Sequence, residues 1–435
     1  MKKKLLSILC MGMTMVGMLS GCKGDVSGDY SNRDDVNEEV VTKKNEQIYA
    51  ERLTEDADTQ ISIDYAIESY KSVQDFSYEL FKQNMTEDNP VLSPVSAYLA
   101  LGMAGTGAEG ETLTEFQKLL GTDMSYIPHS LMSTLPRELE GMKISLANSA
   151  WVDGRFEAEK EYLETIASFY LSDVYRATLS TEQTMLDMNA WIDENTNGLI
   201  PALFQEPLDD DVILALFNTI YFNGEWKLEF KEENTKKRDF ETEDGTVEQV
   251  EMMHLYGEDL QYVNTEEAVG VVLPYKDENM AMVALMPAGN QTVREMYEAM
   301  EWSDICDMLE YKNIKSCNLQ LPKFEVAFER ELNSSLQSMG LEKAFDETLA
   351  DLSGMGTMKD GTNIFIDLVF QKAVVIVDEE GTEAAAVTVV LVNRESCAIE
   401  EPPVDVFFDE PFLYMIVDLE KEIPLFMGIM DNPNK

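Results

Sequence analysis

The side chains that could support catalysis are few in this chain. It has two histidines, His129 and His254, and neither stands in a nucleophile or metal-binding signature. No glycine-rich phosphate loop and no G-x-S-x-G motif occurs in the sequence. The acidic run at residues 209–211 leaves calcium binding as an alternative, but such a run is typical of a solvated turn. We therefore predict no enzyme activity, no cofactor and no metal site.

One stretch, residues 374–403, carries chemistry of another kind. Its apolar run at residues 374–377 predicts a strand, and the acidic residues and glycine at 378–381 predict a turn that exposes the chain. From there to residue 390 the side chains are small and then β-branched, with no proline, and none after Glu383 is charged or bulky. Such a segment fits an exposed loop and a central strand equally well. Its alternate residues share one face by the two-residue period, and all are buriable: Thr382, Ala384, Ala386, Thr388, Val390 and Val392.

The octapeptide at residues 379–386, Glu-Glu-Gly-Thr-Glu-Ala-Ala-Ala, closely resembles the hinge of inhibitory serpins. The resemblance implies a suicide substrate: a serine protease attacks the exposed loop and forms an acyl-enzyme. The freed loop then inserts into the main sheet and traps the enzyme. The hinge residues that it implies are Glu379, Gly381, Thr382, Glu383, Ala384, Ala385 and Ala386.

The bond that serves as bait follows from the family's usual spacing. Counting from Gly381 gives Glu395–Ser396, which suits a glutamate-preferring protease. Arg394–Glu395 is an alternative that suits a trypsin-like enzyme, and cleavage after Val392 or a nearby small residue would suit an elastase-like one. The predicted partner is a serine protease, held in a covalent complex, with a cysteine protease as a second candidate.

The resemblance also assigns residues to the region where the main sheet opens. Ser93 and Ser96 would open the second helix beneath the parting strands, and Trp226 would lie at the mouth, with an ordinary core tryptophan as the alternative. Lys323 would pair with Glu379 as a surface ion pair. Where the family usually has a histidine that contacts a strand asparagine, this chain has Gln371, whose amide can both donate and accept. We expect Gln371 to contact Asn218.

Matching blocks from about residue 64 to 433 indicate one α+β domain with the serpin fold. It has a large mixed or antiparallel main sheet, further sheets, about eight or nine helices and an exposed reactive-centre loop. A helix at residues 161–174 is expected to lie across the main sheet, and Thr112 to Glu115 to form a helix-capping box. Strands are expected at residues 144–152, 212–222, 269–275 and 280–286.

The amino terminus predicts export. Residues 1–21 form a signal peptide with three lysines and an apolar run, and Leu19-Ser20-Gly21-Cys22 resembles a bacterial lipobox. Cys22 would then carry the lipid anchor, with an ordinary signal cleaved nearby as the alternative. Polar residues 22–63 read as a tether with some local helix near residues 46–53, followed by the serpin domain at 64–435. This predicts an extracytoplasmic protein, lipid-anchored at the bacterial cell surface.

The formal charge of −49 becomes −52 when the three signal lysines are removed. Such acidity excludes nucleic acid as a partner and leaves the lipid anchor as the sole membrane contact. Cys306, Cys317 and Cys397 are too few and too widely spaced for a disulfide framework. We expect a monomer.

A second hypothesis is a non-inhibitory serpin or a surface ligand-binding lipoprotein. It accounts for the anchor equally well. It does not account for the absence of proline and of bulky side chains from residues 381–390.

Overall fold

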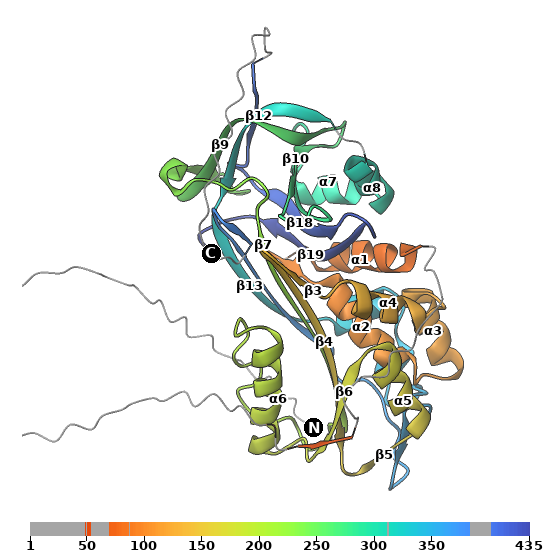
Figure 1. The fold of residues 1–435 in the computed structure, drawn as a ribbon. Helices are drawn as coiled ribbons and strands as arrows, with labels where there is room; N and C mark the ends of the chain where they lie inside the picture. The colour runs from red at the N-terminus through yellow and green to blue at the C-terminus, as the bar shows by residue number, and fades with distance from the viewer. Residues whose placement is uncertain (1–47, 49, 54–68, 87, 311–312, 383–401) are drawn as a thin grey trace, which may run out of the picture. The chain divides into compact units, whose positions relative to one another are not determined.

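The computed structural model describes residues 48, 50–53, 69–86, 88–310, 313–382 and 402–435, all within one compact unit, Asn45–Lys435 (Figure 1). The fold is α+β with a large mixed sheet and further sheets, as predicted. The described residues form nine α-helices: α1 (Lys71–Asn84), α2 (Pro94–Gly105), α3 (Gly110–Leu120), α4 (Tyr126–Thr134), α5 (Lys160–Phe169), α6 (Glu182–Asn195), α7 (Val293–Ala299), α8 (Trp302–Glu310) and α9 (Asn333–Ser338).

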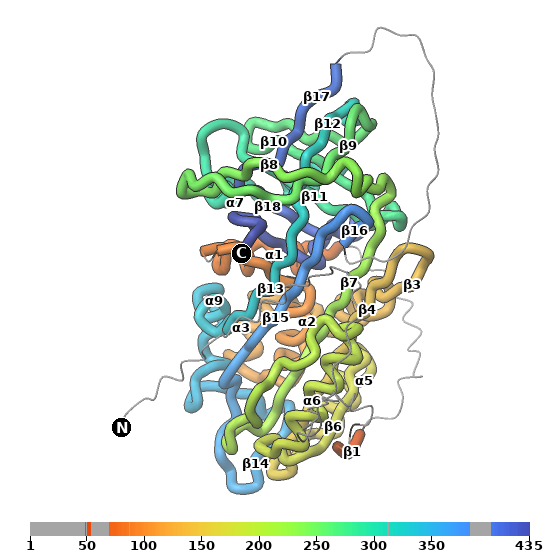
Figure 2. The backbone as a smooth tube through the Cα atoms, turned by 90° about the vertical axis from the view of Figure 1, so that its left-hand side faces the viewer, coloured from red at the N-terminus to blue at the C-terminus, as the bar shows by residue number. Residues whose placement is uncertain are grey.

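The main sheet runs in the order β1-β6-β4-β7-β16-β15-β13, with β3 beside β4 (Figure 2). It is mixed, because β4 pairs parallel to β6 and every other described ladder is antiparallel. Its strands are β1 (Glu51–Arg52), β3 (Arg137–Leu139), β4 (Met142–Asp153), β6 (Ser172–Ala177), β7 (Leu214–Glu225), β13 (Phe324–Glu331), β15 (Phe370–Val377) and β16 (Gly381–Thr382).

The second sheet runs in the order β17-β12-β9-β10-β11-β18-β19-β2, with β8 beside β9. Its last two strands in sequence, β18 and β19, are buried at every residue, as continuous apolar runs predict. The strands are β2 (Val91–Leu92), β8 (Lys236–Glu241), β9 (Val247–Asn264), β10 (Ala268–Pro274), β11 (Met280–Pro287), β12 (Ile314–Pro322), β17 (Val404–Phe407), β18 (Phe412–Asp418) and β19 (Ile423–Met430). A small third sheet pairs β5 (Phe156–Ala158) with β14 (Gly356–Met358).

The helix predicted at residues 161–174 is wrong in extent and in position. Helix α5 ends at Phe169, Leu171 takes a left-handed conformation with φ of 48°, and the next residues form β6. The helix that packs across the main sheet is α6, which Figure 1 shows on the opposite face from α2–α5. The error arose because apolar residues continue past the end of α5 without a glycine or proline to mark it.

The predicted capping box is also wrong. Helix α3 begins at Gly110, and Thr112 instead accepts a hydrogen bond from the backbone N–H of Asp351 (3.0 Å). Glu115 binds the Lys343 ammonium at 2.8 Å. The two side chains therefore stabilise contacts far along the chain, while the helix ends at Leu120 and is capped by Gly121, with φ of 87°.

Five other expectations concern strands and the tether. Strands β4, β10 and β11 confirm three predicted strands within a few residues. Strand β7 begins and ends later than the predicted 212–222, and its first five residues are half-buried. Local helix near residues 46–53 is wrong, because Glu51–Arg52 forms β1 at the sheet edge.

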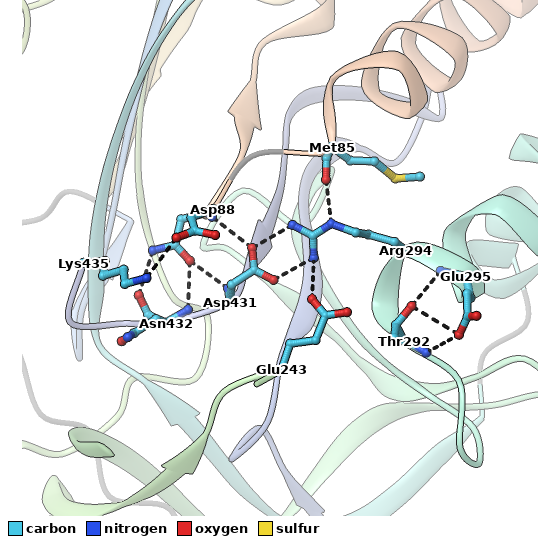
Figure 3. Close-up of polar contacts among 10 residues, drawn as sticks. Met85, Asp88, Glu243, Thr292, Arg294, Glu295, Asp431, Asn432 and Lys435 are labelled. Carbon is cyan, nitrogen blue, oxygen red and sulfur yellow. Dashed lines mark hydrogen bonds and ion pairs between the residues drawn. The ribbon is translucent and has the colours of Figure 1, made fainter. Parts of the chain in front are cut away.

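A buried ion pair fastens the end of the chain to the loop after α1 (Figure 3). Arg294 donates two hydrogen bonds to the Asp431 carboxylate, at 2.8 and 2.9 Å, and a third to the carbonyl of Met85 at 2.7 Å. Asn89 accepts from the backbone N–H groups of Asp431 and Asn432. Because β19 lies in the core, this network holds the last strand in place.

Replacing Arg294 with methionine should destabilise the native protein by about 3 kcal/mol, because Asp431 would remain buried without its cation. The matched control is Lys435→Ala, which removes an exposed ion pair with Asp88 and should cost about 0–1 kcal/mol. Urea denaturation of both variants measures the difference. Equal losses would contradict this account.

Candidate functional site

The chain turns sharply between β15 and β16. The Asp378 carboxylate accepts hydrogen bonds from the backbone N–H groups of Glu380 (3.0 Å) and Gly381 (3.1 Å). Gly381 then lies against β7, where a Cβ would come within 2.0 Å of the carbonyl oxygen of Gly224. Only glycine fits this approach of two backbones. The turn therefore directs the chain into the main sheet.

The start of the hinge is already part of the sheet. In β16, Gly381 pairs with Glu225 and Thr382 with Gly224 on one side, and Thr382 pairs with Val377 on the other. The expectation that the chain is exposed here is wrong, since Thr382 is 3% and Glu379 is 7% exposed. Residue periodicity shows which face a strand buries, but it does not show where pairing begins.

An aromatic pair holds the hinge from below. The Tyr275 hydroxyl is hydrogen-bonded to Thr382 Oγ1 at 2.8 Å, and the Tyr275 ring stacks on Trp226 at 4.8 Å between centroids. Trp226 donates from its indole N–H to the carbonyl of Asp378 (2.9 Å) and from its backbone to that of Glu380 (2.8 Å). Trp226 thus contacts both ends of the turn. The sequence analysis assigned no role to Tyr275, although Tyr275 is the last residue of the strand predicted at 269–275.

The Glu379 carboxylate is held by two partners. Lys323 Nζ lies 2.5 Å from one oxygen, and the Thr235 hydroxyl donates to the other at 2.6 Å. Burial alone would raise the pKa of Glu379, but these hydrogen bonds outweigh it and hold the pKa below its usual value. The pair predicted from the sequence is present, but it is not a surface pair, since the Glu379 side chain is 9% exposed. Thr235 carried no sequence signal.

The other residues assigned to the region where the main sheet opens form one hydrogen-bonded group. They are Ser93, Ser96, Asn218 and Gln371, and the partner of Gln371 differs from the one expected. Gln371 accepts from the Ser93 backbone N–H at 3.0 Å and donates to the Ser93 carbonyl at 2.7 Å. The expected contact between Gln371 and Asn218 is not found between these two described residues, because the Gln371 amide is hydrogen-bonded to the backbone of Ser93 instead. Ser96 donates to the Asn218 carbonyl (3.4 Å), and the Asn218 amide donates to Asn148 Oδ1 (2.8 Å). Among the described residues, Asn218 Oδ1 is buried without a hydrogen-bond donor.

Below β16, strands β7 and β15 have no partner between them in the described structure. Strand β7 pairs with β4 and β16, and β15 pairs with β13 and β16 (Figure 2). Each strand therefore presents a row of backbone donors and acceptors toward the other without a ladder. Because β16 is antiparallel to both, a strand that continued from it would complete both ladders.

Several predicted residues lie outside the described residues: Cys22, Glu383, Ala384, Ala385, Ala386, Arg394, Glu395, Ser396 and Cys397. Where side chains are described, no cluster of three metal-ligating groups is found. Within the same residues, no helix is long and apolar enough to cross a membrane.

Acid should loosen the hinge. The folded pKa of Glu379 lies below the ordinary value of 4.5, so the ionised group stabilises the native state at neutral pH. That contribution is lost as the pH falls through the lowered pKa. We expect Glu379→Gln to cost about 1–2 kcal/mol at pH 7. Thermal unfolding at pH 7 and at pH 3 should show the gap to the unmodified protein closing in acid, and a constant gap would refute it.

Comparisons with known proteins agree with this geometry. The family model described as serpin (serine protease inhibitor) matches residues 71–433. The human protein Serpin B4 is 30% identical over 399 residues, covering 82% of this chain and 97% of its own, and rat alpha-1-antiproteinase is 28% identical over 401 residues, covering 88% and 95%.

Solved structures of tengpin, a thermophilic serpin, are also similar. The native state gives a TM-score of 0.78 at 31% identity, covering 85% of this chain and 96% of tengpin. The latent state gives 0.72 at 30% identity, covering 84% and 98%. The chain belongs to the serpin family, which is described as a family of serine protease inhibitors.

Proposed function

We propose that this chain inhibits serine endopeptidases as a suicide substrate. The target's serine attacks a loop carbonyl, the peptide bond breaks, and the new amino terminus leaves with the proton taken from the serine. The acylated loop then pairs between β7 and β15 and draws the enzyme along the sheet. The distorted enzyme loses the oxyanion hole that deacylation requires, so the ester persists.

One observation carries this proposal: the length of the open edge matches the length of the uncharged loop. The pairing of Gly381 with Glu225 and Thr382 with Gly224 fixes the register. Continued residue by residue, it brings Val392 opposite Leu214, the first residue of β7. After Glu383, the first charged residue in the sequence is Arg394, two positions beyond that end. The segment that the sheet has room for is therefore the segment free of charge.

The same register shows which residues the side chains of the inserted loop would meet on the buried face of the sheet. It brings Ala384 between Phe222 and Val375, which are 4% and 2% exposed. It also brings Thr388 between Asn218 and Gln371, where the Asn218 Oδ1 acceptor lacks a donor among the described residues. A threonine hydroxyl is a donor of suitable size. The inserted strand would thus supply a donor to a group that has none among the described residues.

The bait bond is proposed as Glu395–Ser396, with Arg394–Glu395 as the alternative. Both lie just past the end of the register, so insertion through residue 392 leaves the acyl linkage outside the sheet. A twelve-residue strand spans roughly 40 Å, which sets the distance that the trapped enzyme would travel.

The site of action is proposed from the sequence motif alone. Cys22 would carry lipid and hold the serpin domain, as a monomer, on the outer side of a bacterial membrane through the tether of residues 22–63. Such a location suits an inhibitor of extracellular proteases.

The decisive experiment mixes the protein with serine proteases of glutamate, basic and small-residue preference. We expect a complex that survives boiling in detergent. The released fragment, identified by mass spectrometry, should begin at Ser396.

Replacing Ala384 with arginine should abolish the complex and leave a cleaved substrate, because the charge would enter a buried site. Ala384→Ser is the matched control. Simple cleavage of the unmodified protein by every protease would favour a non-inhibitory serpin instead.

Thr388→Val should weaken the inserted form selectively. It leaves the Asn218 acceptor buried without a donor, at a cost of about 1–3 kcal/mol. We expect the nicked variant to melt at a lower temperature than the nicked unmodified protein, while the two intact proteins melt alike. Thr388→Ser keeps the hydroxyl and should behave as the unmodified protein. A loss of the same size in the intact Thr388→Val protein would rule out this pairing.

A further inference from the structure

A short amino-terminal segment, residues 48 and 50–53, is docked on the main sheet although it precedes the family-matched range of 71–433. Its strand β1 pairs with the outer edge of β6, Glu51 opposite Arg176 and Arg52 opposite Tyr175. Leu53 donates its backbone N–H to the carbonyl of Val174 at 2.7 Å. We call these residues the docked segment.

The docked segment also binds helix α6. The backbone N–H of Ala50 donates to Asp187 Oδ2 at 2.9 Å, and Asp187 is a helix carboxylate only 2% exposed. Arg52 forms an ion pair with Asp173 on β6. The side chains of Ile48 and Ala50 pack on the cluster beneath α6. The segment therefore joins α6 to the edge strand through backbone, charge and apolar contacts.

Helix α6 covers the place where the sheet must open. Its cluster, which includes Trp191 and Ile192, contains Trp151 of β4 and Tyr175 of β6, and Phe217 of β7 and Val374 of β15 pack against it. The cluster beneath the helix therefore reaches strands on both sides of the unpaired edge. A strand that entered between β7 and β15 would push every second side chain toward the helix. Insertion thus requires α6 to lift from the sheet.

We propose that the docked segment is a clamp that holds α6 on the sheet and slows loop insertion. Its contacts with Asp187 exist only while α6 lies against the edge of β6, so they stabilise the closed sheet relative to the state in which the helix has lifted. A contact of this kind acts on the rate of conversion, which sets the lifetime of a metastable protein. The clamp rests on the proposed insertion mechanism, but it does not require that a protease be trapped.

Ala50→Pro removes the backbone N–H that binds Asp187 and keeps the side chain at position 50 small. We expect the full-length protein to convert about tenfold faster to a form with the loop inserted, since a hydrogen bond to a buried carboxylate is lost. Arg52→Ala should give a smaller acceleration of roughly twofold, because its ion pair is partly exposed. Glu51→Ala is the matched control, since Glu51 lies in the same strand with its side chain exposed.

Conversion is measured at raised temperature as loss of loop cleavage by a non-target protease, since an inserted loop resists cutting. Hydrogen exchange at the amides of Tyr414 and Met415 in the buried strand β18, which does not pair with the docked segment, reports whether each variant is folded. Equal conversion rates for Ala50→Pro and Glu51→Ala, or no conversion in any variant, would overturn the clamp. Faster conversion in Ala50→Pro without any detergent-stable protease complex would support the clamp and refute the proposed inhibition.

Discussion

The structure depends on two rows of backbone groups, along β7 and β15, that face each other without a ladder among the described residues below β16. Backbone donors and acceptors left without a partner favour the addition of a strand. At the upper end the close contact of Gly381 with Gly224 admits the first residues of that strand and fixes their register. In the proposed mechanism, the other contacts around the opening would either delay the rest of the strand or receive it.

The polar contacts divide the opening into zones. At the top, Glu379 and Thr382 are bound by Lys323, Thr235 and Tyr275, so the hinge is anchored. Halfway down, Gln371 is fully used by the backbone of Ser93, whereas Asn218 keeps an acceptor without a donor among the described residues. In the proposed mechanism the anchored top would direct the incoming chain, and a donor supplied to the Asn218 acceptor would favour completing the sheet.

The sequence predicts the hinge, the Lys323–Glu379 pair and most strands, because each depends on local residue types or on a well-marked family pattern. It does not predict that Thr382 is buried, since that depends on Tyr275 approaching from another sheet. The partner of Gln371 was missed for the same reason: two acceptable partners compete, and only packing decides between Ser93 and Asn218. The helix over the sheet was assigned to α5 instead of α6, because hydrophobic spacing does not specify which face of a sheet a helix covers.

The absence of charge from one segment matters for the proposed insertion. Over a quarter of the residues in this chain are charged, with a formal charge of −49, whereas residues 384–393 carry no charge. The main sheet buries residues such as Phe222 and Val375 beside the opening, and a charged side chain placed there would lose its hydration without gaining a partner. Residues 384–392 carry no charge, so the proposed insertion would bring no ionised side chain into these buried positions.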